Sequence, residues 1–166
     1  MKKLFVSAII ILGFLSTTFG QVSATATASA TIITPIAISK TVDMNFGNVA
    51  VSAVAGTVVI TPAGVRTKTG GVTLPVVAGT ISAASFTVTG LGSYTYTITL
   101  PSTPLTISNG ANAMTVNAFT STPSGTGILS GGSQVLNVGA TLNVGVNQAA
   151  GLYTSATPFS VTVNYN

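Results

Sequence analysis

The sequence predicts an all-β protein with an immunoglobulin-like antiparallel β-sandwich, and three observations support this class. Apolar and hydroxyl residues alternate with period two along several segments, as in strands with one buried face. Turns rich in Gly, Pro and Asn separate these segments at the spacing of short antiparallel strands. Beyond residue 20 no stretch has a convincing helical period. Short strands joined by such turns favour a sandwich.

Residues 93–100 form the clearest predicted strand, because apolar side chains alternate there with Ser and Thr. The same alternation recurs at 57–61, 85–89 and 159–165. The apolar rows of these segments predict one core within a single domain of residues 35–166. The predicted core consists of Phe46, Val58, Ile60, Phe86, Val88, Tyr94, Tyr96, Ile98, Phe159, Val161 and Val163.

The composition argues against most enzyme chemistry. Among 166 residues there is no His and no Cys, and Asp43 is the one residue with a side-chain carboxylate. Acid–base catalysis near neutral pH needs His or paired carboxylates, so we expect no enzyme activity. The same shortage leaves only carbonyl-rich sites for a cation, so we expect no metal site and no cofactor.

The N-terminus has the pattern of a secretion signal. Two lysines precede an apolar run at residues 4–15, which is too short to span a bilayer as a helix. We expect residues 1–20 to be a signal peptide cleaved after Gly20, although Ala24 or Ala26 also satisfies the small-residue rule. The product would reach the exterior or the cell surface through the periplasm and would not be membrane-integral. Its three basic residues and one acid give a net charge of +2, too low for nucleic-acid binding.

Residues 21–34 are the most informative part of the chain. Along them an apolar row alternates with Ser and Thr until Pro35 ends the pattern. The row consists of Ala24, Ala26, Ala28, Ala30 and Ile32. This pattern fits an ordinary first strand of the sandwich, and it also fits a donor strand that completes the sheet of a neighbour. Small Ala side chains suit a shallow groove.

Two sets of residues resemble known families. The alternating row followed by Pro35-Ile36-Ala37-Ile38 resembles the N-terminal donor segment of the major subunits of class 5 (alpha-type) fimbriae. Nearly the whole remaining chain resembles the secreted bacterial family called domain of unknown function 4402. That family is similar in outline to spore coat protein U domains and to chaperone–usher pilins. The segments that carry this second resemblance are 44–49, 71–74, 84–90, 136–142, 151–153 and 161–165.

The C-terminal segment adds to the resemblance to chaperone–usher subunits. Those subunits end in an alternating strand with a penultimate aromatic residue, which pairs with a periplasmic chaperone during folding. The matching residues of this chain are Gly151, Phe159, Val161, Val163 and Tyr165. The resemblance implies a periplasmic chaperone and an usher as partners, besides self-assembly or a neighbouring subunit. The Cys pair of many such subunits is absent, and Gly151 lies slightly farther from the end than is usual.

Three functions are compatible with these patterns. The first is a non-enzymatic structural subunit of a surface fibre or coat, fimbrial-like, that assembles by β-strand donation. The second is a monomeric secreted binding or adhesion module for polysaccharide or a surface, with the N-terminal strand completing its own sheet. The third is ice binding through Thr rows at 25–31 and 95–99, which is disfavoured because the rows do not recur at a fixed period.

The remaining charges suggest minor roles. Arg66 and Lys68 precede Gly70-Gly71 and are typical of a solvated hairpin, although an anionic glycan is a second interpretation. Lys40 and Asp43 are expected to protect a sheet edge from unwanted strand pairing.

Overall fold

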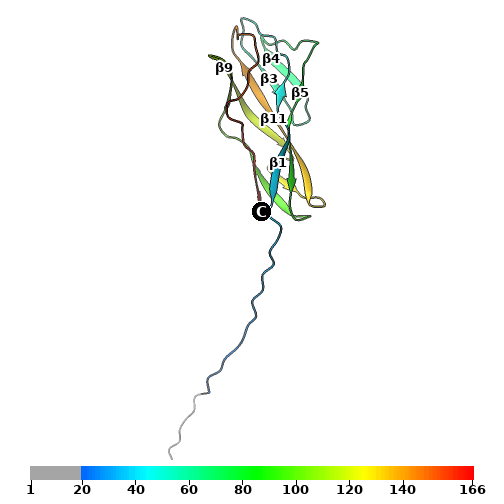
Figure 1. Ribbon diagram of the computed structural model, residues 1–166, viewed down its shortest axis with the longest axis vertical. Helices are drawn as coiled ribbons and strands as arrows, with labels where there is room; N and C mark the ends of the chain where they lie inside the picture. Colours follow the sequence, from blue (N-terminus) through cyan, green and yellow to red (C-terminus); the bar gives the residue numbers. More distant parts are fainter. Residues whose placement is uncertain (1–19) are drawn as a thin grey trace, which may run out of the picture. The chain divides into compact units, whose positions relative to one another are not determined.

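The computed structural model describes residues 20–166, which fall into two units that we describe separately (Figure 1). The described part of the first unit is residues 20–32, and the second unit is Ile33–Asn166. Residues 20–166 contain twelve strands and no helix. The strands are β1 (Ala37–Val42), β2 (Asn45–Phe46), β3 (Gly56–Ile60), β4 (Arg66–Gly70), β5 (Ile81–Ser82), β6 (Ala84–Thr89), β7 (Thr95–Thr99), β8 (Leu105–Asn109), β9 (Asn112–Thr122), β10 (Thr126–Ile128), β11 (Ser133–Val144) and β12 (Thr162–Tyr165).

Seven strands form one antiparallel sheet centred on β11. The first half of β11 pairs with β6, its second half pairs with β3, and β9 pairs along its other edge. β1 extends the sheet beyond β6, β4 extends it beyond β3, and β8 forms a hairpin with β9. β1 therefore lies at one end of the strand order.

A second antiparallel sheet contains β10, β7 and β12 in that order, and β2 and β5 form a small two-stranded sheet. Tyr96 on β7 lies opposite Gly127 of β10, and Ile98 lies opposite Val163 of β12. β12 is the last strand of this order. Within residues 20–166, β1 and β12 thus each keep one edge that no strand pairs with.

The long central strand β11 depends on a glycine. Its buried side chains alternate as Leu136, Val138, Ala140 and Leu142, so one face of β11 supplies much of the core. A Cβ atom at Gly139 would collide with the carbonyl oxygen of Ile60 on β3. Glycine therefore allows the close backbone approach at the middle of the sheet.

The buried side chains form two clusters. The first lies between the seven-stranded and three-stranded sheets and consists of Ala84, Phe86, Val88, Tyr96, Leu129, Leu136, Val138, Val161 and Val163. The second consists of Val58, Val72, Val116, Ala140, Leu142 and Val144. No residue of β7, β10 or β12 belongs to the second cluster. The three-stranded sheet thus covers only part of the large sheet.

The all-β sandwich predicted from the sequence is confirmed, with one correction to its core. Seven predicted core residues are buried, whereas Phe46, Ile98 and Phe159 are half-buried. Tyr94 is 42% exposed and does not belong to the core. The alternation runs through it, but β7 begins only at Thr95, after a turn in which Ser93 has a φ of 66°.

Residues 20–36 form no strand, so an N-terminal strand is not confirmed. Residues 20–32, which we call the ribbon, are all exposed, including the large side chains of Val22 and Ile32 at 97% and 93%. The signal peptide predicted at residues 1–20 lies outside the described residues except for Gly20.

Candidate functional site

A cleft of about 910 Å³ opens beside the second core cluster. One wall consists of residues 40–51, which run from β1 through β2 into the following loop. The opposite wall belongs to the segment between β11 and β12, residues 145–161, which we call the strap. Buried side chains that line the cleft are Ala84, Phe86, Val116, Leu142 and Val144. The cleft therefore gives access to both core clusters.

The cleft exists because the second layer of the sandwich is incomplete. The three-stranded sheet ends before the second cluster, and the strap crosses this region without forming a strand. Half-buried apolar side chains consequently line the cleft where a further strand would cover them. They are Met44, Phe46, Val49, Leu105, Ile107, Met114 and Phe159.

The strap is fixed to β8 through Thr154 and to β9 through Gln148, whose amide donates to the Ala113 carbonyl at 3.2 Å. Ser108 and Thr154 exchange two backbone hydrogen bonds of 2.9 and 3.1 Å. The Gln148 amide donates to the Tyr153 hydroxyl at 3.0 Å, which itself donates to the Ala149 carbonyl at 2.8 Å. Farther along, a second hollow of about 570 Å³ shares Leu105, Pro158 and Phe159 with the cleft. Pro158 and Phe159 of the strap thus line both hollows.

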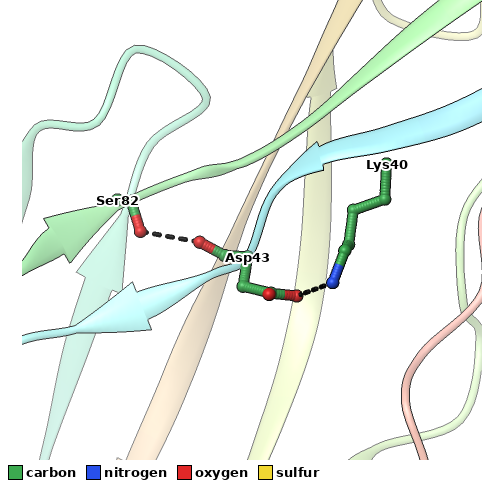
Figure 2. A network of polar contacts seen from close by, with 3 residues as sticks. All are labelled: Lys40, Asp43 and Ser82. Atoms are coloured by element: carbon green, nitrogen blue, oxygen red, sulfur yellow. Dashed lines mark hydrogen bonds and ion pairs between the residues drawn. The ribbon is translucent and has the colours of Figure 1, made fainter.

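Polar contacts hold the other wall in place (Figure 2). The Lys40 ammonium lies 2.6 Å from Asp43 Oδ1, and Ser82 Oγ donates to the Asp43 carbonyl at 2.6 Å. Both side chains of the ion pair are exposed, at 55% and 79%, so solvent screens it and it contributes little to stability. Lys40 lies on the edge strand β1 and Asp43 directly follows that strand, and protection of this edge stays a prediction.

Arg66 supports the same wall and is not a freely solvated charge. Its Nη1 donates to the carbonyl of Phe46 at 2.6 Å and to that of Asn48 at 2.9 Å. The predicted hairpin is present, because β4 pairs with β3, and Lys68 is exposed on it. The sequence interpretation missed the Arg66 contacts because residues 46–48 are distant in sequence.

The predicted C-terminal residues occupy two different settings. Gly151 lies in the strap and Phe159 lines the cleft, whereas Val161 and Val163 are buried in the first cluster. Tyr165, on β12, also packs against the first cluster as a partly buried side chain, and its hydroxyl donates to the carbonyl of Thr34, three residues before β1, at 3.0 Å. None of these positions was predicted to contact residues 33–36.

The row predicted to act as donor is exposed throughout. Its five residues belong to the ribbon, and none of them takes part in a strand. Strand donation by this row requires a second molecule, so the role of the row as a donor strand stays a prediction.

The outer face of the three-stranded sheet is uncharged and, except for Ile128, polar. Thr97 on β7 lies between Thr126 of β10 and Asn164 of β12. The exposed side chains of this face are Thr95, Thr97, Thr99, Thr126, Ile128, Thr162 and Asn164. The Thr row at residues 25–31, by contrast, lies on no sheet.

Fold and site together define a two-layered all-β domain with an unfilled apolar cleft, preceded by an exposed ribbon. The chain belongs to the family described as domain of unknown function (DUF4402), whose family model matches residues 36–165. Neither the curated proteins nor the solved structures gave a match. Over residues 20–166 no helix has the length and apolar character needed to cross a membrane.

Proposed function

We propose that the protein is a non-enzymatic structural subunit of a surface fibre or coat, exported through the periplasm and assembled by β-strand donation. The observation that carries this proposal is the apolar cleft beside the second core cluster, where the three-stranded sheet does not reach. Apolar side chains line this cleft, which has a volume of about 910 Å³ and opens to the outside. Covering apolar surface is favourable by roughly 25 cal/mol per Å², so an occupant of the cleft would stabilise the domain.

The ribbon has the properties of such an occupant. Its thirteen residues, 20–32, would span about 43 Å at about 3.3 Å per extended residue. The Ala row would face the cleft and the Ser/Thr row would face solvent, in keeping with the period of two. An added strand gains main-chain hydrogen bonds from a sheet edge, and β1 and β12 each offer such an edge.

The proposed occupant is the ribbon of a second copy of the same chain. A donor at one end and an acceptor cleft elsewhere make a head-to-tail contact, which generates an open fibre when the rotation does not close. A periplasmic chaperone that covers the cleft until assembly would be a partner, and an usher would serve as the assembly site. The single carboxylate and the lack of His are the reasons to propose a structural role instead of catalysis.

The test compares two substitutions on neighbouring ribbon residues. Ala28→Asp places a charge on the row that enters the cleft, so it should reduce polymer yield at least tenfold because the carboxylate would be buried unpaired. Thr27→Asp adds the same charge on the solvent-facing row and should leave the yield within about twofold. Polymer is measured by size-exclusion chromatography with light scattering and by electron microscopy of the exported chain.

Both variants should give a soluble, folded subunit, since residues 20–32 are exposed. Equal polymer yields from the two variants would reject donation of the ribbon. The absence of polymer from the parent chain at every concentration would do the same.

A second function is favoured by the polar face of β7, β10 and β12. Its seven exposed side chains carry no charge and are held in register by the sheet, a suitable surface for a neutral polysaccharide. In that case the protein is a monomeric binding module. A concentration-independent monomer that binds insoluble polysaccharide, and loses binding when Thr97 is replaced by Lys, would favour this function.

A further inference from the structure

We propose that Tyr165 is a latch that prevents the ribbon from folding back into its own cleft and thereby directs it to a second copy. This inference rests on the proposed strand donation and concerns its direction. The first observation is the hydrogen bond from the Tyr165 hydroxyl to the Thr34 carbonyl at 3.0 Å. In the sequence Thr34 lies between the ribbon and β1, two residues after the ribbon ends.

The latch is fixed from several sides. The same hydroxyl accepts a 2.7 Å hydrogen bond from the Leu91 amide, and the Tyr165 ring packs edge-on against Tyr94 at 5.6 Å. A Cβ atom at Gly90 would collide with the hydroxyl, so a glycine is needed beneath it. Because both polar functions of the hydroxyl are used, it is held in one position.

The latched position matters because residues 33–36 could otherwise form a turn. A four-residue connection that contains Pro is ordinary for a hairpin, and β1 begins directly after it at Ala37. Such a hairpin would lay the ribbon along the unpaired edge of β1, between β1 and β12. The hydrogen bond from β12 to Thr34 ties these two strands together where that hairpin would enter. The ribbon must then leave the domain, and the nearest available cleft belongs to another molecule.

The experiment removes only the hydroxyl. Tyr165→Phe in the full exported chain keeps the ring but frees Thr34, so the ribbon should fold back. In dilute monomer, hydrogen exchange of the amides of residues 22–32 should slow at least tenfold relative to the parent chain, because those amides would pair with a sheet edge. At high concentration the polymer yield should fall at least fivefold. Tyr94→Phe is the matched control, since the Tyr94 hydroxyl takes no part in the latch, and it should change neither readout.

A second variant guards against misfolding of the first. Gly90→Ala pushes the hydroxyl away from its position and should also protect the ribbon in monomers. If either variant is folded by circular dichroism and its ribbon exchanges as fast as in the parent, the latch is rejected. This outcome is distinct from failure of strand donation, which would appear as absence of polymer from the parent chain itself.

Discussion

Tyr96 is the phenol at the centre of the first core cluster, and its environment has a measurable consequence at high pH. Its side chain is fully buried, and its hydroxyl donates to Gln134 Oε1 at 2.8 Å. Burial raises the pKa of Tyr96 above its usual value of 10.0, because the phenolate would lose solvation. The folded state therefore holds this proton more tightly than the unfolded state. The associated stability is fully present below pH 10.0 and is lost as the pH rises through the raised pKa.

We expect the urea concentration at the midpoint of unfolding of the parent chain to decrease as the pH rises above about 10. Tyr96→Phe should remove the part of this fall that belongs to Tyr96, and at neutral pH it should cost about 1 kcal/mol for the lost hydrogen bond. Gln134 keeps its bond from the Ile128 amide, so no buried acceptor is orphaned. Parallel curves for Tyr96→Phe and the exposed control Tyr94→Phe from pH 8 to 11 would contradict this assignment.

At the scale of single residues, the sequence predicted burial correctly where it follows from the alternation within a strand. It did not predict the contacts that a side chain makes with residues distant in sequence. Val88 and Val163 follow the pattern of their own strands and are buried. Arg66 donates a hydrogen bond to the carbonyl of Phe46, and Tyr165 donates one to the carbonyl of Thr34. Nothing in the local sequence of Arg66 or Tyr165 indicates these partners. The Gly90 requirement is likewise visible only once Tyr165 lies above it.

At the scale of a secondary-structure element, substitutions in the last strand test which of its side chains face the core. Val161 directly precedes β12 and is buried in the first cluster, whereas its neighbour Thr162 is exposed. Val161→Asp should bury an unpaired carboxylate and lower the free energy of unfolding by about 3 kcal/mol or more. Thr162→Asp should change it by less than about 0.5 kcal/mol. Urea unfolding and exported yield give the comparison, and similar values for both variants would show that the strand faces the other way.

Elements with clean alternation could be predicted, but the most important element of the core could not. β6, β7 and β12 were evident from alternating Thr and apolar residues. β11 contains Gly139 and Ala140 near its centre, and this pair resembles a break in a strand. The glycine instead allows the close approach of the β3 backbone. The cleft was not predictable either, because it arises where β7, β10 and β12 fail to cover a sheet formed by segments distant in sequence.

At the scale of the whole molecule, the proposed assembly pairs the incomplete second layer of one copy with the exposed ribbon of another. A domain with a cleft but no ribbon could accept a strand and would end an assembly. A domain with a ribbon but no cleft could only donate a strand and would also end it. Under the proposed donation, a chain with both would add copies in one direction without limit, since every added copy would bring a new cleft or a new ribbon. Growth of this kind is sensitive to any copy that can accept a strand but cannot donate one.

Ala28→Asp creates such a copy, because its cleft residues are unchanged while its ribbon carries a charge on the inserted row. When it is mixed with the parent chain before assembly, each variant molecule that accepts a ribbon should stop growth at that point. We therefore expect the mean fibre length in electron micrographs to fall steeply with the variant fraction, to roughly ten copies when one molecule in ten is the variant. Thr27→Asp, mixed in the same proportions, should leave the length distribution unchanged.

Fibres that keep their length while excluding labelled Ala28→Asp molecules would show that the variant cannot accept a ribbon. Closed dimers of constant size would show that donation is reciprocal. Unchanged fibre length with the labelled variant incorporated, or closed dimers, would overturn the head-to-tail fibre, because only a directional chain with one donor and one acceptor per copy is terminated by a molecule that has lost its donor alone.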